Sequence, residues 1–374
     1  EVSCGIDLFF GGGEFDHSDA FGRGLTVAPW PNEAVPRSLF ATEDGELIPA
    51  RLSGETWRTA TLYGNVLSSF GICYNIDRLA DLGVEKPPQQ WSDLADPRYA
   101  GVLGVADPTK SGSIAKVFEM IIHQQMYLRV RAEGFDDGQI ERFEKLIGEH
   151  ERAVGRDKYR RGDIPPTVPA AYQAAVEAGW LDGVRLVQLL GANARYFTDS
   201  ASKVPVDVGK GDAAVGMAID FYGRYQAEYS RSPDGRERMV YFTPVGGSSI
   251  SCDPISLLRG APNRQTAVRF IEFILSEDGQ RLWTYRPGTP GGPEKYALRR
   301  LPIRRDFYPS TIPAFQAAHE RHAKYAAEPL GDAAVDPYRL ASQFIYHRRW
   351  TSGHFSIQRE LVKAMCLDSG DELR

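Results

Sequence analysis

Short apolar runs alternate along this chain with segments whose apolar residues recur at helical spacing, and Gly, Pro and Asp mark the joins. The runs at residues 6–10, 69–74, 101–105 and 215–219 have the length and composition of strands. Strands that alternate with helices pack in layers, with helices on the faces of a sheet. The sequence therefore predicts an α/β fold.

The first run ends in three consecutive glycines, Gly11, Gly12 and Gly13. The run predicts a buried parallel strand, and open α/β sheets bind ligands at the carboxyl ends of such strands. Consecutive glycines are costly in chain entropy, so this position needs either the close approach of a ligand or a tight turn. The spacing is not a GxGxxG fingerprint, which argues against a dinucleotide site. Gly12 and Gly13 are candidate ligand-binding residues.

Helical periodicity is strong after Ser113 and after Asn263, a favoured N-cap residue. Residues 131–170 have no strong period before a helix expected near 170–178. The end of the chain is rich in aromatic and basic residues and predicts further helices that cover the surface.

Length and charge narrow the classes of function. The chain has 374 residues, which suits two domains, and a hydrophobic fraction of 42%, which is ordinary for a protein with a sizeable core. A formal net charge of -5 gives no attraction to nucleic acid or to an anionic membrane. No apolar run is long enough to span a bilayer.

The amino end runs directly into a strand as EVSCGIDLFFGGG, without a visible signal peptide. We expect the sequence to be a mature or trimmed piece of a longer precursor that carries such a peptide.

The four cysteines, Cys4, Cys73, Cys252 and Cys366, have no metal-binding spacing. Cys73 and Cys252 both lie in strand-like segments. A disulfide between them in an oxidising compartment is one alternative, and small buried thiols, which we favour, are the other.

Ser111, Gly112 and Ser113 lie between a strand and a long helix. The first turn of a helix offers unpaired N–H groups and a partial positive charge, which hold phosphate or carboxylate without a formal cation. The alternative is a plain serine N-cap.

Other polar or aromatic residues follow strands or precede them. Asp220 is a candidate partner for an amine or a sugar hydroxyl, and Tyr222 for a hydrogen bond, with a plain wall position as the alternative for both. Trp57 and Tyr63 are candidates for stacking on a ring or sugar face, although Trp57 is more often a core residue.

The polar segment RYFTDSAS contributes three further candidates, Arg195, Asp199 and Ser200. Arg195 suits a bidentate anion contact, and its alternative is a solvated loop arginine. The seven histidines are scattered, and neither an HExxH nor a GxSxG motif is present. We therefore expect neither an enzyme nor a cofactor or metal.

Five segments together resemble one family, the extracellular solute-binding proteins of ABC importers. They are IDLFFGGG (6–13), LSSFGICYN (67–75), WSDLADPRYAGVLGVADPTKSGS (91–113), GDAAVGMAIDFYGRY (211–225) and SCDPISLLRGAPN (251–263). The resemblance covers roughly residues 5 to 290 and is strongest to the branch that includes ferric-iron, polyamine and phosphorylated-sugar binders.

The resemblance implies a type II periplasmic-binding-protein fold: two α/β lobes, each a mixed sheet flanked by helices, with the ligand in the cleft between them. Lobe one would be residues 1–99 and 248–374, with a C-terminal helical extension, and lobe two residues 100–247. The usual chain begins with a strand–helix–strand unit that is absent here, which agrees with a trimmed amino end. Ferric-binding relatives carry two adjacent tyrosines where this chain has Phe221 and Tyr222, and this weakens a bare-iron site.

The function implied is the periplasmic or extracytoplasmic substrate-binding component of an ABC importer, a monomer that captures a small polar solute by lobe closure. An organic anion, phosphorylated or carboxylated, is the first choice, a polyamine or thiamine-like cation the second and chelated ferric iron the third. The partners implied are the permease subunits in the membrane, with no nucleic acid. An enzyme or a receptor-linked sensor on the same fold are the alternatives from other classes.

Overall fold

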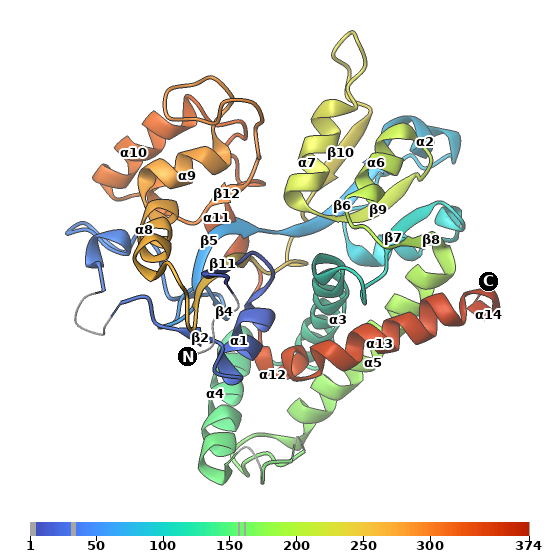
Figure 1. Cartoon of the computed structure of the whole chain (residues 1–374). Helices are drawn as coiled ribbons and strands as arrows, with labels where there is room; N and C mark the ends of the chain where they lie inside the picture. The colour runs from blue at the N-terminus through green and yellow to red at the C-terminus, as the bar shows by residue number, and fades with distance from the viewer. Residues whose placement is uncertain (1–4, 31–34, 156–157, 161, 374) are drawn as a thin grey trace. The chain divides into compact units, whose positions relative to one another are not determined.

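The computed structural model describes residues 5–30, 35–155, 158–160 and 162–373. The chain divides into two compact units (Figure 1). Unit 1 comprises Glu1–Gly71 and Ile219–Ile345, and unit 2 comprises Ile72–Ala218 and Tyr346–Arg374. Each unit contains a sheet with helices around it, which confirms the α/β class.

The sheet of unit 1 has the strand order β1-β11-β5-β12, and β2 also pairs with β11. Its strands are β1 (Leu8–Phe10), β2 (Thr26–Val27), β5 (Tyr63–Ser68), β11 (Ser251–Leu258) and β12 (Leu301–Pro302). Strand β1 is antiparallel to β11, with Leu8 opposite Leu257. The prediction of a buried parallel strand is therefore wrong: β1 lies at the end of this strand order, and Phe10 is 44% exposed.

The helices of unit 1 are α1 (Glu14–Gly22), α7 (Asp220–Tyr229), α8 (Arg264–Leu275), α9 (Glu277–Thr284), α10 (Pro313–Ala323) and α11 (Pro337–Ala341). Unit 1 has a core that includes Trp57, Ile255, Ile271 and Phe307, and helices α8, α10 and α11 contribute residues to it. The short strands β3 (Arg51–Leu52) and β4 (Glu55–Thr56) form a hairpin, and β10 (Met239–Phe242) follows α7. Helix α8 begins directly after Asn263, as predicted.

Within unit 2 the strand order runs β6-β9-β7-β8, and β7 is parallel to both β8 and β9. The strands are β6 (Phe70–Asn75), β7 (Leu103–Ala106), β8 (Ala194–Thr198) and β9 (Val215–Ile219). The predicted runs at 69–74, 101–105 and 215–219 correspond to β6, β7 and β9.

The helices of unit 2 include the predicted helix after Ser113. They are α2 (Ile76–Asp81), α3 (Gly112–Ala132), α4 (Asp137–Val154), α5 (Ala170–Asn193), α6 (Lys203–Lys210), α12 (Arg348–Thr351), α13 (Phe355–Val362) and α14 (Gly370–Leu373), with a π-helical segment at Lys363–Asp368. Helices α3 and α5 cross closely, because a Cβ atom added at Gly183 would lie 2.6 Å from the Cα atom of Ile122.

Helix α4 contradicts the expectation that residues 131–170 lack periodic structure. The side chain of Asp136 accepts the backbone N–H of Gln139, and the Gln139 side chain accepts that of Asp136, which forms a capping box. Ile140, Phe143 and Ile147 are the buried side chains of the helix. The high charge of its other positions conceals this narrow apolar stripe.

The boundaries of the two units differ from the expected lobes, most clearly at residues 346–374, which belong to unit 2. The Tyr346 hydroxyl donates to Glu119 Oε1 at 2.5 Å, and Arg349 Nε donates to Glu144 Oε2 at 2.8 Å. Helix α13 also packs against α3 (Figure 1). These contacts attach the end of the chain to the long helices of unit 2.

The two thiols considered for a disulfide are free and buried. Cys73 Sγ lies 3.4 Å from the carbonyl oxygen of Gly216, and Cys252 Sγ lies 3.7 Å from that of Thr56. Burial raises the pKa of Cys73 to about 12. The alternative of small buried thiols is correct; Cys4 lies outside the described residues.

Candidate functional site

In unit 2, two parallel strands bring their carboxyl ends to one edge of the sheet. Ala106 of β7 lies opposite Thr198 of β8, and the N–H of Asp107 donates to the carbonyl of Thr198 at 2.8 Å. The loop that leads into α3 therefore lies beside the segment that follows β8. This edge combines the predicted residues Ser111, Gly112 and Ser113 with Asp199 and Ser200.

Hydrogen bonds within the loop from Asp107 to Ile114 order the start of α3. Ser111 is the N-cap and accepts the N–H of Ile114 at 3.4 Å. The N–H of Ser111 donates to the carbonyl of Asp107 at 3.0 Å, and Thr109 Oγ1 donates to Asp107 Oδ1 at 2.7 Å. Gly112 has open space where a Cβ atom would lie, so the backbone of the first turn is accessible.

Arg195 is not brought to the same edge. It lies at the register shift near the start of β8, where Leu103 pairs with Ala194 and Gly104 with Tyr196. The distance along the strand to Thr198 is about 10 Å at 3.3 Å per residue. The exposed side chain of Arg195 matches the alternative of a solvated arginine, and nothing places it beside the start of α3. Asp199 and Ser200 are exposed and directly follow the carboxyl end of β8.

In unit 1, the glycine loop forms a tight turn between β1 and α1. Gly11 and Gly12 have φ angles of 90° and 85°, which favour glycine because other residues are strained there. The N–H of Gly11 donates to the carbonyl of Pro254 at 3.0 Å, and the N–H of Gly13 donates to Asp16 Oδ2 at 3.1 Å. The turn alone thus accounts for two of the glycines.

The side chain of His17 hydrogen-bonds this loop, a role that the sequence analysis did not predict. Its Nε2 atom lies 2.8 Å from the carbonyl oxygen of Gly11, and its Nδ1 atom lies 2.7 Å from Ser256 Oγ. The ring stacks on Phe9 with centroids 4.0 Å apart. Burial lowers the pKa of His17, so the neutral ring is the form that supports the loop.

Trp57 and Tyr63 lie in the core of unit 1. Trp57 is 0% exposed, and its indole N–H donates to the carbonyl of Ile250 at 2.9 Å. The Tyr63 hydroxyl donates to the carbonyl of Ala60 at 2.9 Å, and burial raises the pKa of Tyr63 to about 12. Both polar atoms are used within the core, so the stacking roles expected for these residues are wrong.

Asp220 is fully buried and already paired. It accepts the N–H of Phe221 at 2.7 Å and Arg224 Nη2 at 3.0 Å. The carboxylate therefore stabilises the start of α7, and the expected pairing with a ligand amine is wrong. Tyr222 is half-buried, and its ring tilts against Phe221 at a centroid distance of 4.2 Å.

Arg300 is a second residue that sequence reasoning missed. Its guanidinium carbon lies 4.1 Å from the ring centroid of Phe221, and its Nη2 atom donates to Ser68 Oγ at 3.2 Å and to Asp253. Asp253 is adjacent to Pro254, whose carbonyl accepts the N–H of Gly11. The Arg300 guanidinium therefore links the strand that holds the glycine loop to Phe221 at the start of α7. The adjacent arginines 299 and 300 were the available signal.

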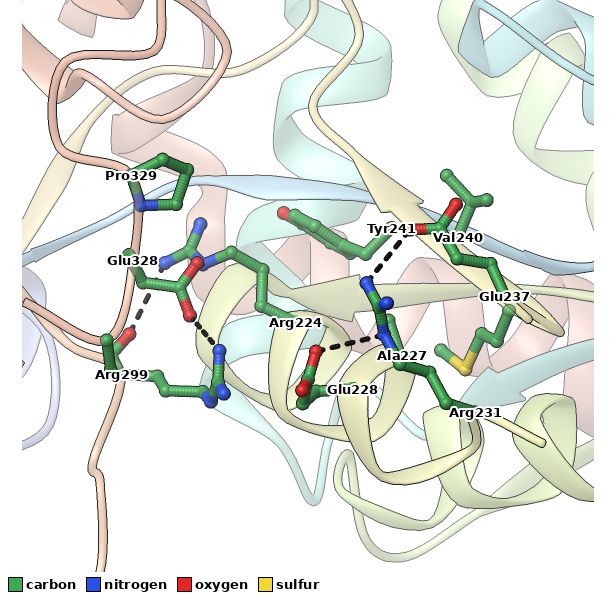
Figure 2. A pocket seen from close by; sticks show the side chains of 12 residues that line it. Arg224, Ala227, Glu228, Arg231, Glu237, Val240, Tyr241, Arg299, Glu328 and Pro329 are labelled. Atoms are coloured by element: carbon green, nitrogen blue, oxygen red, sulfur yellow. Dashed lines mark hydrogen bonds and ion pairs between the residues drawn. The ribbon is translucent and has the colours of Figure 1, made fainter. Parts of the chain in front are cut away.

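A pocket of about 270 Å³ lies in unit 1, lined mainly by charged residues of α7, β10 and the segments near residues 299 and 328 (Figure 2). Arg224 Nε lies 3.3 Å from Glu328 Oε2, and Arg299 Nη1 donates to Glu328 Oε1 at 2.6 Å. Burial lowers the pKa of Arg224, but the carboxylates of Asp220 and Glu328 outweigh burial and raise the pKa above its ordinary value. These opposite charges already neutralise one another inside the pocket.

In the described ranges, no group of three His, Cys, Asp or Glu side chains is arranged to hold a metal ion. The helices of that same part of the chain are also too short or too polar to cross a bilayer.

Comparison with known proteins places the fold. The chain is 22% identical over 276 residues to an uncharacterized protein of Haemophilus influenzae. The aligned stretch covers 74% of this chain and 60% of the relative's length. It is structurally similar to the periplasmic binding protein AfuA from Actinobacillus pleuropneumoniae, solved with fructose-6-phosphate bound (TM-score 0.58, 17% identity, 96% of this chain and 82% of that one). A spermidine/putrescine ABC transporter substrate-binding protein, PotD of Streptococcus pneumoniae, is similar at a TM-score of 0.52 and 14% identity, over 96% of this chain and 84% of that one.

These structural likenesses show the fold, the two-lobed α/β fold of periplasmic binding proteins. The family of bacterial extracellular solute-binding proteins matches residues 35–307, most of the chain. The chain therefore belongs to the bacterial extracellular solute-binding proteins.

Proposed function

We propose that this protein is the extracytoplasmic substrate-binding component of an ABC importer and that it captures a small organic anion, phosphorylated or carboxylated, by lobe closure. The family match supports solute binding. The observation that carries the choice of an anion is the start of α3 at the carboxyl edge of β7 and β8, where the open backbone at Gly112 lies among the hydroxyls of Ser111 and Ser113.

An anion suits this edge because the first N–H groups of a helix are only partly satisfied within the helix. Ser111 takes up the N–H of Ile114. The neighbouring N–H groups of Gly112 and Ser113 belong to the first turn, where the helix dipole favours negative charge. Ser113 and Ser200 are the hydroxyls that we assign to the solute, with Gly12, Gly13, Asp199 and Tyr222 as further candidates.

A cationic solute has less support. Asp220, the carboxylate considered as the partner of such a cation, is buried and paired with Arg224. Chelated iron has less support too, since Phe221 has no ligating oxygen where ferric binders carry a tyrosine. AfuA was solved with a sugar phosphate, which we take as the first compound to test.

The remaining parts of the proposal follow from the family. We propose a periplasmic location, a permease in the membrane as the partner, no catalytic activity and a monomeric state. A receptor-linked sensor would bind solute in the same way and differs only in the partner. Co-purification of the protein with permease subunits in the presence of solute separates the two.

A thermal-shift screen tests the solute class. Fructose 6-phosphate, a phosphonate, spermidine and a ferric chelate are compared at equal concentration. A true solute at a hundred times its dissociation constant stabilises the protein by about 2.7 kcal/mol. Stabilisation by the phosphorylated or phosphonate compounds alone supports the proposal, and stabilisation by spermidine or the ferric chelate alone contradicts the choice of an anion.

Ser113→Ala, with Ser342→Ala as a control, tests the site. The expected result is weaker anion binding by Ser113→Ala at unchanged stability, measured by calorimetry. Ser342 is exposed and donates only to the carbonyl of Arg339 at 2.7 Å, so its variant should bind normally. Equal affinity in both variants would remove the hydroxyl of Ser113 from the site.

A further inference from the structure

Helix α13 makes a specific contact with the loop between β7 and α3. Arg359 Nε donates to the carbonyl of Pro108 at 2.7 Å, and Arg359 Nη2 donates to the carbonyl of Thr109 at 2.9 Å. Buried Gln358 and Val362 hold α13 on the body of unit 2 on either side of this arginine. The contact joins residues far apart in the chain but within one unit.

Arg359 satisfies both carbonyls. Pro108 is buried, and a buried carbonyl without a hydrogen bond costs free energy. A guanidinium presents several N–H donors in a fixed plane, so one arginine fixes two neighbouring carbonyls relative to the helix that carries it. Arg359 therefore sets the path of the chain at Pro108 and Thr109.

That path leads directly into the first turn of α3. The N–H groups of Lys110 and Ser111 both donate to the carbonyl of Asp107, at 3.1 and 3.0 Å. A loop this short transmits a shift at Pro108 to the N-cap, because few torsion angles separate the two. The direction of the N–H groups at the start of α3 thus depends on where Arg359 holds the loop.

We infer that Arg359 is a positioning residue, which fixes the start of α3 in the geometry that binds the solute without touching the solute. This makes the C-terminal segment a part of the binding apparatus of unit 2. The consequence for affinity rests on the proposed function, whereas the consequence for the loop does not.

Hydrogen exchange of the solute-free protein tests the loop. In Arg359→Ala, the amides of Lys110 and Ser111 should exchange at least about tenfold faster, since a factor of ten corresponds to about 1.4 kcal/mol, near the lower end for a charge-assisted hydrogen bond. Lys363→Ala is the matched control, because Lys363 follows α13 and pairs with Asp368 at 3.2 Å. Unchanged exchange of these amides in Arg359→Ala would overturn the inference.

Calorimetry with fructose 6-phosphate tests the link to binding. The expected loss of affinity in Arg359→Ala is about tenfold. Val362→Ala separates positioning from general damage, because it removes buried apolar contact from the same helix and leaves both hydrogen bonds in place. It should lower the melting temperature without a matching loss of affinity. Arg359→Lys, which donates from a single point, should restore part of the affinity.

The outcomes distinguish the two claims. Fast exchange together with weak binding in Arg359→Ala supports the inference. Fast exchange with wild-type affinity, or an equal loss of affinity in Val362→Ala, overturns the positioning role. If the wild-type protein does not bind fructose 6-phosphate, that solute fails as the choice under the proposed function, and the exchange result alone decides whether Arg359 sets the loop.

Discussion

Replacement of Glu144 by glutamine should destabilise unit 2 more than any surface substitution, because one carboxylate serves four donors. Glu144 Oε1 accepts from the Tyr172 hydroxyl at 2.6 Å, from Trp350 Nε1 at 2.9 Å and from Arg349 Nη2 at 2.5 Å. Glu144 Oε2 accepts Arg349 Nε at 2.8 Å. Burial raises the pKa of Glu144, but the hydrogen bonds and charge of Arg349 outweigh burial and hold the pKa below its ordinary value.

The magnitude follows from the charge that remains. Both side chains of the Glu144–Arg349 pair are 12% exposed, so Glu144→Gln leaves a largely buried guanidinium without its carboxylate. Loss of one member of a buried ion pair costs about 3–5 kcal/mol. For a unit of this size, each kcal/mol lowers the melting temperature by about 2–4 °C. We therefore expect a loss of at least about 6 °C.

Urea denaturation measures the loss of unfolding free energy, and thermal melting measures the decrease in melting temperature. Tryptophan fluorescence can follow both, since Trp350 donates to the same carboxylate. The control is Glu149→Gln on the exposed side of the same helix, which should change stability by less than about 0.5 kcal/mol. Glu144→Gln combined with Arg349→Gln should be less destabilised than the sum of the single variants. A loss below about 1 kcal/mol in Glu144→Gln would refute the reasoning.

Three further predictions concern other parts of the molecule. Burial lowers the pKa of His322 to about 4 from 6.5. The unfolded state therefore binds the proton more tightly, and up to about 3 kcal/mol of unfolding free energy should be lost as the pH falls from 6.5 to 4. In urea denaturation, the unfolding free energy of His322→Gln should depend less steeply on pH than that of the wild type. An equal slope in the two proteins would contradict this prediction. Gly183→Ala should cost about 1–3 kcal/mol by overpacking against Ile122, whereas Gly148→Ala, which meets no atom within 4 Å, should be neutral or stabilising in the same melting assay. Because Cys73 is free, a reductant should leave the melting temperature unchanged, and a decrease would indicate a disulfide.

Local patterns in the sequence were enough to predict many elements. The apolar run at 215–219 is strand β9, and Asn263 precedes helix α8. Such elements depend on propensity and periodicity within one stretch of chain, which a sequence displays directly. Helix α4 was missed because its apolar stripe is narrow among charged residues, although the capping box at Asp136 marked its start.

The candidate site depended on both levels. The sequence placed Ser111, Gly112 and Ser113 between a strand and a long helix, and three glycines at the end of the first strand, because strands, helices and turns follow local patterns. The structure then identified Ser111 as the N-cap and the turn as the reason for Gly11 and Gly12. Only the tertiary structure decided that Arg195 lies near the start of β8, away from its carboxyl end, that Trp57 is in the core, and that Asp220 forms an ion pair with Arg224. Strand register, burial and ion pairing depend on partners distant in the chain, and no single segment of sequence encodes those partners.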